Sequence, residues 1–207
     1  EIVTSQETQI TSINTRLETA IDSVEVLLPY TSLANIWDEA FGLFGAARNY
    51  GLYSDSEIME QTTYDENGDG SIDAFTEMNY AFAVMASERD ASAELSNTDY
   101  SGAIWNAFLM GRQIIQQSHN RTAVEGAGYH NFLKEQADII VENLEKVLAA
   151  SIIHHLNDAI ESIDDALLDG DASEFDSHDY SYFRQWSVLK GMAVSLHNFA
   201  PANVAAW

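Results

Sequence analysis

The fold class of this chain is decided by the stretch from Asn131 to Leu168, NFLKEQADIIVENLEKVLAASIIHHLNDAIESIDDALL. It contains neither glycine nor proline. Its inward-facing positions recur every three or four residues: Ala137, Val141, Leu144, Leu148, Ile152, His155, Ala159 and Ile163. That spacing places one apolar stripe along an α-helix. At 1.5 Å per residue, a helix of about 38 residues would be roughly 57 Å long.

The same helical period is found on both sides of this stretch. Apolar residues three or four apart predict further helices over residues 10–28, 33–44, 55–61, 75–95, 100–117 and 180–199. Gly126 and Gly128 predict a loop before the long helix. No segment alternates apolar and polar residues as a strand does. We therefore predict an all-α fold, a multi-helix bundle of long helices. Since no proline- or serine-rich break divides the chain, we expect a single domain over residues 1–207.

Two glycines lie three residues apart on the second predicted helix. The spacing of Gly42 and Gly45 indicates a close approach to a neighbouring backbone. The alternative is that Gly45 only marks the end of the helix.

The composition excludes several classes of partner. The 207 residues include 33 acidic and 9 basic ones, for a formal net charge of −24, and 46% of them are hydrophobic. Such a chain has material for a packed core and is not a disordered acidic tail. Nucleic acids and anionic membranes both require clustered basic residues, so we expect neither as a partner. An acidic surface suits multivalent cations, basic partners or a saline environment.

A candidate calcium loop follows the third predicted helix. In an EF-hand, oxygen ligands fall at loop positions 1, 3, 5, 7, 9 and 12, and a glycine at position 6 allows a sharp turn. Gly70 occupies position 6 here. The first five ligand positions carry Asp65, Asn67, Asp69, Ser71 (through its backbone carbonyl) and Asp73. The spacing predicts calcium as the cofactor, because magnesium tolerates an all-protein cage poorly.

The last ligand position departs from that pattern. Position 12 is Thr76, and the glutamate expected there comes one residue late, as Glu77. Either Glu77 turns in from the following helix, or a ligand comes from elsewhere, or the site is weaker. The alternative without a metal is an acidic turn that caps a helix starting near Ala74.

Two further groups of residues are candidates for a ligand or second metal site. Asp38 and Glu39 are adjacent on a helix and diverge by about 100°. We expect one of them to need a partner, and Arg112, which lies among apolar residues, is the best candidate. A buried ion pair is favoured over catalysis. His154, beside His155 in the long helix, is the candidate imidazole ligand.

Four blocks of the sequence resemble a known family. They are WDEAFG (37–42), AFLMGR (107–112), IHHLND (153–158) and WSVLKGMAVSL (186–196). In this order they resemble an uncharacterised family of bacterial exported, often lipid-anchored, all-helical proteins with the motif H-W-D-E-A-F-G-Y-F-G. The chain opens without the basic and apolar regions of a signal peptide. We therefore expect a mature form or a segment of a longer protein.

That family is in turn similar to the imelysins, envelope-associated helical proteins labelled as putative metallopeptidases and linked to iron uptake. Their marker, G-x-H-x-x-E, implies a metal site that includes Glu39. Here the histidine position is Ile36, and Val188 stands where the resemblance implies an acidic residue. These departures argue against a metal at that site and against peptidase activity. His154 matches the histidine block of the family.

Together these features predict a non-enzymatic, calcium-binding module of the bacterial cell envelope or surface. We expect it to be exported, whether to the cell surface, the periplasm or the medium. Its ligand would be a metal ion, a peptide or another small molecule. One alternative is an imelysin-like metallopeptidase or metal-uptake protein that uses Asp38, Glu39 and His154. Another is the ligand-binding segment of a calcium-dependent adhesin.

Overall fold

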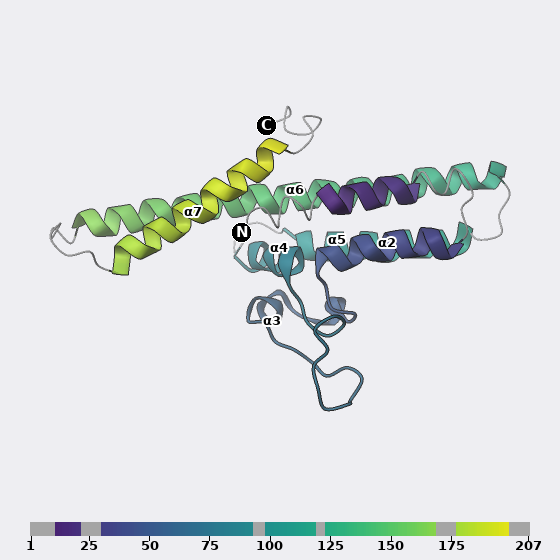
Figure 1. The fold of residues 1–207 in the computed structure, drawn as a ribbon, viewed down its shortest axis with the longest axis horizontal. Coiled ribbons are helices and arrows are strands. Elements are labelled where there is room, and N and C mark those ends of the chain that lie inside the picture. Colours follow the sequence, from purple (N-terminus) through teal and green to yellow (C-terminus); the bar gives the residue numbers. More distant parts are fainter. Residues whose placement is uncertain (1–10, 22–29, 93–97, 119–122, 169–176, 199–207) are drawn as a thin grey trace. The chain divides into compact units, whose positions relative to one another are not determined.

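The computed structural model describes residues 11–21, 30–92, 98–118, 123–168 and 177–198. Within these residues the backbone forms helices and turns, with no strand, so the predicted all-α class is confirmed (Figure 1). Residues 11–21 are helical. The elements that follow are α2 (Tyr30–Phe44), the 3-10 helix η1 (Tyr50–Leu52), α3 (Asp55–Met59), α4 (Ala81–Ala91), α5 (Tyr100–Ser118), α6 (Ala123–Leu168) and α7 (Ser177–Asn198).

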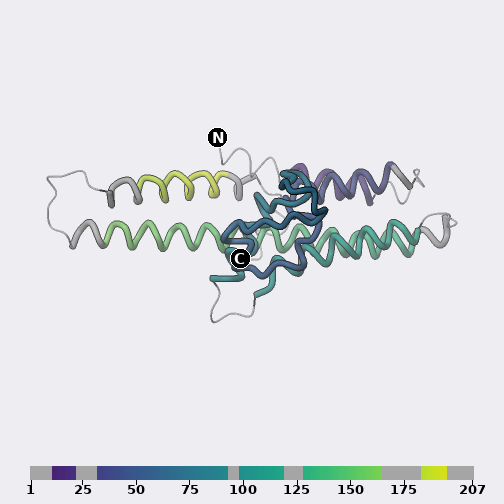
Figure 2. The backbone as a smooth tube through the Cα atoms, turned by 90° about the horizontal axis from the view of Figure 1, so that it is seen from below, coloured from purple at the N-terminus to yellow at the C-terminus, as the bar shows by residue number. Residues whose placement is uncertain are grey.

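The chain divides into two compact units. One, here called the main unit, runs from Gln9 to Val147. The other, here called the hairpin unit, consists of Leu148–Trp207 with Glu1–Thr8. In the hairpin unit, the second part of α6 and all of α7 run antiparallel and side by side (Figures 1 and 2). The expectation of a single domain stays a prediction.

Most of the predicted helices lie where the apolar period placed them. The helix predicted over residues 10–28 is seen over 11–21, and its remainder, 22–28, lies outside the described residues. The same holds for residues 93–95 and 199 at the ends of two other predicted helices. The predicted loop at Gly126 and Gly128 is wrong, because α6 begins at Ala123 and passes through both glycines. Gly128 is exposed, so its glycine costs the helix only about 1 kcal/mol of propensity.

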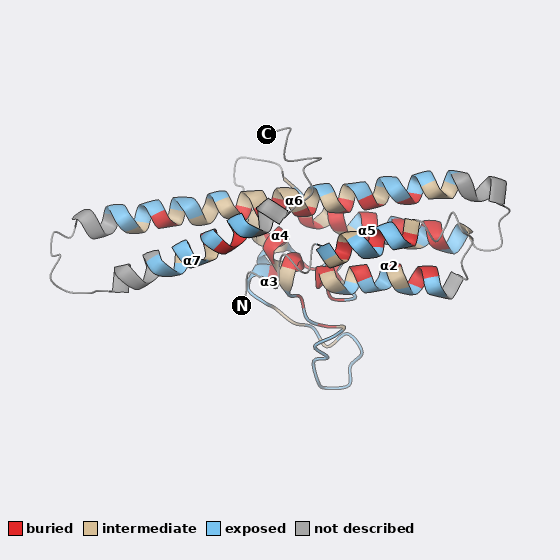
Figure 3. Ribbon diagram, turned by 45° about the horizontal axis from the view of Figure 1, so that its top comes forward, coloured by how far each residue is buried: buried red, intermediate tan, exposed pale blue. Residues whose placement is uncertain are grey.

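The core of the main unit is built around aromatic side chains from α2 and α5. The indole N–H of Trp37 donates to the backbone oxygen of Phe108 at 3.0 Å, and the two rings meet edge to face with centroids 5.9 Å apart. Phe44 is fully buried, and its ring stacks on that of Phe108 at 5.8 Å. Gly111 lies against Trp37, since a Cβ there would come within 2.0 Å of the indole Cζ2. Figure 3 shows buried residues along both α2 and α5.

The segment before α4 differs from the prediction. Residues 75–80 are turns and extended backbone, and the helix begins only at Ala81. The backbone N–H of Tyr80 donates to the oxygen of Gly45 at 2.8 Å, and that of Arg48 donates to the oxygen of Thr76 at 2.8 Å. These two bonds tie the segment to residues 45–48, so its backbone groups are not available for a helical ladder.

The two glycines of α2 have different roles. Gly45 has a φ of +88°, and a Cβ there would lie 2.4 Å from the backbone oxygen of Tyr80. A Cβ at Gly42 would meet nothing within 4 Å. The predicted close approach is therefore confirmed at Gly45, which also stands just after the end of α2. Gly42 is an ordinary exposed helical position.

Candidate functional site

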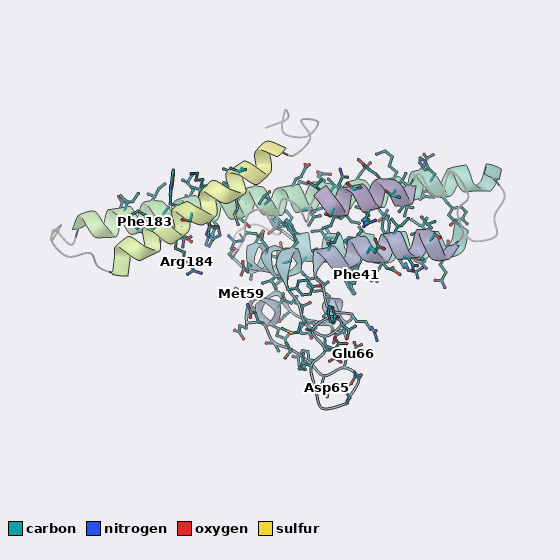
Figure 4. All side chains as sticks on the ribbon, in the orientation of Figure 1. Phe41, Met59, Asp65, Glu66, Phe183 and Arg184 are labelled. Carbon is teal, nitrogen blue, oxygen red and sulfur yellow. The ribbon has the colours of Figure 1, made fainter. Side chains whose placement is uncertain are left out.

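The candidate calcium site is the acidic loop, defined here as Asp65–Glu77, between α3 and α4. Figure 4 labels its first two residues, Asp65 and Glu66. The loop contains five carboxylates and no lysine, arginine or histidine. Gly68 and Gly70 have φ values of +72° and +84°, which glycine adopts without strain. They allow two sharp turns within the loop.

The backbone of the acidic loop curls around its first carboxylate. Asp65 Oδ1 accepts hydrogen bonds from the backbone N–H groups of Gly68 at 2.7 Å and Asp69 at 3.2 Å. Its Oδ2 accepts from the N–H of Gly70 at 2.8 Å. Three successive N–H groups therefore converge on Asp65, at the first ligand position of the predicted site.

The next predicted ligands form a local network among themselves. Asp69 Oδ1 accepts from the hydroxyl of Ser71 at 2.7 Å and from its backbone N–H at 2.9 Å. The amide of Asn67 donates to Asp69 Oδ2 at 3.1 Å. These bonds, the Ser71 hydroxyl first, hold the pKa of Asp69 below its ordinary value. Asp73 Oδ1 accepts from the N–H of Phe75 at 2.8 Å.

Glu77 turns into the loop. Its side chain is only 2% exposed. Its Oε1 accepts from the backbone N–H groups of Glu66 at 3.0 Å and Asn67 at 3.2 Å, and its Oε2 accepts from that of Asp73 at 2.9 Å. Glu77 does turn toward the loop, as the first of the alternatives has it, but it does so from a turn and not from the following helix, which begins only at Ala81. Through these bonds Glu77 holds the start and the end of the loop together.

The loop's carboxylates do not meet at one point. Within the described residues, no three His, Asp or Glu side chains lie together as a metal site would require. The oxygens of Asp65, Asp69 and Glu77 instead face N–H groups of the loop itself. The donor types still fit a hard cation, because all are oxygens. To coordinate one, Asp69 and Asp73 would have to turn away from these N–H groups toward a shared centre.

The two carboxylates of α2 each pair with a different arginine. Arg112 Nε lies 2.9 Å from Asp38 Oδ1, so the predicted partner is confirmed. Arg16 Nε lies 3.1 Å from Glu39 Oε2. The predicted burial of the pair is wrong, because the side chains of Arg112 and Asp38 are 36% and 52% exposed. The inward position of this turn is taken by Trp37, which leaves Asp38 on the outer face.

An exposed pair of this kind contributes little to stability, and a double-mutant cycle can measure it. For Asp38→Asn and Arg112→Gln we expect a coupling free energy below about 1 kcal/mol in urea unfolding, because water screens both charges. The pair Lys134–Asp138, at 2.7 Å on α6, serves as a more exposed reference. A coupling of several kcal/mol at Asp38–Arg112 alone would contradict this and indicate a desolvated pair.

The candidate imidazole lies in the other unit. His154 Nε2 is 3.3 Å from Asp158 Oδ2, one turn later on α6. His155 Nδ1 lies 2.7 Å from Gln185 Oε1 of α7. His154 thus belongs to the hairpin unit, whereas Asp38, Glu39 and Arg112 belong to the main unit.

Sequence reasoning missed a partly buried polar cluster where η1, α3, α4 and α5 meet. The Tyr50 hydroxyl donates to the backbone oxygen of Ala83 at 2.8 Å and lies 3.0 Å from the Ser87 hydroxyl. The Ser101 hydroxyl donates to Asp55 Oδ1 at 3.0 Å. Burial raises the pKa of both Tyr50 and Asp55. The only signal in the sequence was a serine at an inward position of α4 and another on α5.

Comparisons with known proteins identify no relative of this chain: no protein family, no curated protein and no solved structure matches it. The resemblance to the bacterial exported family therefore stays a prediction. None of the helices in the described part of the chain is both long enough and apolar enough to span a bilayer.

Proposed function

We propose that this protein is a calcium-binding, non-enzymatic ligand-binding module of an exported bacterial envelope or surface protein. The observation that supports the calcium assignment is the buried carboxylate of Glu77, directed into a loop with oxygen-bearing residues at alternate positions. The ligand of the module is a metal ion, a peptide or another small molecule.

The charge of the loop supports a cation. Residues 65–77 carry five carboxylates, and the segment contains no basic residue. Among the described residues, the arginine and lysine ion pairs involve carboxylates outside this loop. These five carboxylates lie within thirteen residues and repel one another, and the backbone N–H groups of the loop relieve that repulsion only in part. A divalent cation would neutralise two of the five charges.

The backbone of the loop favours calcium over magnesium. Calcium takes six to eight oxygens, including backbone carbonyls and water, in a flexible geometry. The turns at Gly68 and Gly70 curl the backbone so that the N–H of Gly70 reaches Asp65 and that of Asp69 reaches Asn67. Magnesium needs a near-ideal octahedron with several waters, which a loop of this length supplies less readily.

A non-enzymatic role is preferred because both carboxylates of α2 pair with arginines from other helices, Arg16 and Arg112. Asp38 and Glu39 each have a guanidinium as partner, which competes with a metal ion or a reacting group. An imelysin-like metallopeptidase would need both carboxylates free to bind metal. The adhesin alternative is compatible with the same calcium loop and differs only in the ligand.

Calcium should raise the melting temperature of the full chain. Calcium at tenfold its Kd stabilises the folded state by about 1.4 kcal/mol, which corresponds to roughly 3–6 °C for a protein of this size. The measurement is a thermal melt followed by circular dichroism, in millimolar calcium and in chelator. The same concentration of magnesium is expected to give a smaller shift.

Matched variants separate the loop from general charge effects. Asp69→Asn removes a predicted ligand and should abolish the calcium shift. Asp138→Asn removes the same charge from an exposed position on α6 and should leave the shift intact. An unchanged melting temperature across millimolar calcium, or an equal shift in both variants, would rule out the loop as the binding site.

A further inference from the structure

Few of the side chains that the structure describes in the hairpin unit are buried. The second part of α6 and α7 are joined by the contact between His155 and Gln185. The buried apolar residues of the described part of this unit are Leu148, Ala159, Leu189 and Met192. Two antiparallel helices form a single layer, and a stable helical domain needs a second layer to cover its apolar surface.

Each of the two helices carries an apolar stripe that is open to solvent. On α6 it comprises Ile153, Leu156, Ile160 and Ile163, which are 40–59% exposed. Their spacing of three, four and three residues keeps them within an arc of about 80°. On α7 it comprises Trp186, Lys190, Ala193 and Val194, which together with Leu189 line a hollow of about 420 Å³.

The two stripes point to the same side of the hairpin. Ile160 directly follows buried Ala159 on α6, and Lys190 directly follows buried Leu189 on α7. One residue further along a helix is a rotation of about 100°. In two right-handed helices that run antiparallel and face each other, this rotation turns both stripes toward one side. The stripes therefore form one surface, here called the hairpin face.

We propose that a second copy of this chain covers the hairpin face, so that two hairpins form a four-helix bundle. From their exposed fractions, the six large apolar side chains leave on the order of 600 Å² per copy open to water. Two copies would then bury on the order of 1,200 Å², the lower end of the range for specific, stable interfaces. The hollow beside Trp186 would receive an apolar side chain of the second copy.

The distribution of charge favours a second copy over a basic partner. The chain has 33 acidic residues and 9 basic ones, yet the eight residues of the hairpin face include no carboxylate. Their one charged group is Lys190. Asp158 and Glu161 lie on other sides of α6, and Asp164, four residues after Ile160, borders the hairpin face without belonging to it. Two such acidic chains repel each other least when they meet through a face without carboxylates. A basic partner would instead bind the acidic surfaces of the chain.

Sedimentation equilibrium of the full chain at physiological salt tests this proposal. The wild-type protein should show twice the mass of one chain at micromolar concentration. Ile160→Glu on α6 and Trp186→Glu on α7 should each raise the dissociation constant by about tenfold or more, because a carboxylate would be buried without a partner. Leu109→Glu is the matched control, since Leu109 is similarly exposed but lies on α5 of the main unit.

Two further measurements keep the outcome clear. Circular dichroism should show equal helix content in all variants, and Ile160→Ala should weaken the dimer if the glutamate variant fails to fold. Wild-type protein with the mass of one chain at all concentrations overturns the proposal. So does a dimer that neither Ile160→Glu nor Trp186→Glu weakens. A single-chain mass with a lower melting temperature in Ile160→Glu would mean that the chain covers this face itself.

Discussion

Gly45→Ala should destabilise the main unit by about 3 kcal/mol or more, whereas Gly42→Ala should stabilise it by up to about 1 kcal/mol. Gly45 has a φ of +88°, and alanine in the left-handed region costs about 1–2 kcal/mol. Its methyl group would also lie 2.4 Å from the backbone oxygen of Tyr80, which cannot move without its neighbours. A Cβ at Gly42 would meet nothing within 4 Å, so alanine there only improves helix propensity.

The large loss of stability expected for Gly45→Ala also reflects a backbone hydrogen bond that Gly45 makes to the segment before α4. Its backbone oxygen accepts from the N–H of Tyr80 at 2.8 Å, which fixes the segment that leads from the acidic loop into α4. Displacing Tyr80 would strain this bond as well as the packing around it. Urea unfolding of both variants provides the comparison. Similar free energies of unfolding for Gly45→Ala and Gly42→Ala would show that the close approach does not exist in solution.

Helical period was sufficient to predict the fold class, and its failures have a physical cause. Residues 75–80 carry apolar side chains at helical spacing, yet Phe75 is 88% exposed and the backbone is not helical. The backbone oxygen of Thr76 and the N–H of Tyr80 bond to Arg48 and Gly45, some thirty positions earlier in the chain, and no local sequence pattern indicates these partners. At Gly126 and Gly128 the error was the reverse, since a glycine within a long helix costs it only about 1 kcal/mol, which is too little to end it.

The candidate site shows the same limit on prediction. Alternate oxygen-bearing residues and Gly70 could be read directly from the sequence, because that spacing is local. The direction of Glu77 could be given only as one of several alternatives, because it depends on N–H groups ten and eleven residues away. The partner of Asp38 was predicted correctly across 74 positions, since few basic residues were available, but its exposure was not.

Periodicity also does not tell which neighbour an apolar stripe faces. Ile163 continues the inward series of α6, yet it is 40% exposed. A stripe that packs within the chain and one that packs on a second copy have the same spacing. On α6, the residues that pack within the chain can be told from those of the hairpin face only once the position of α7 is known. The contact between His155 and Gln185 fixes that position.

Trp37→Ala should lower the free energy of unfolding of the main unit by about 3–5 kcal/mol. Trp37 is 1% exposed, its indole N–H donates to the backbone of Phe108, and its ring packs on the edge of the Phe108 ring. Removing it leaves a cavity at the contact between α2 and α5. Leu109→Ala, at an exposed position of the same helix as Phe108, should change the free energy by less than about 0.5 kcal/mol.

A second substitution shows whether the loss comes from this contact. Gly111→Ala should be strongly destabilising in the wild-type protein, because its methyl group would come within 2.0 Å of the Trp37 ring. In the Trp37→Ala background the same methyl group would enter the space left by the indole. We therefore expect Gly111→Ala to be neutral or stabilising there, with the difference measured by urea unfolding. An equal penalty in both backgrounds would mean that Gly111 is required for another reason and that the packing of α5 against Trp37 differs from that described.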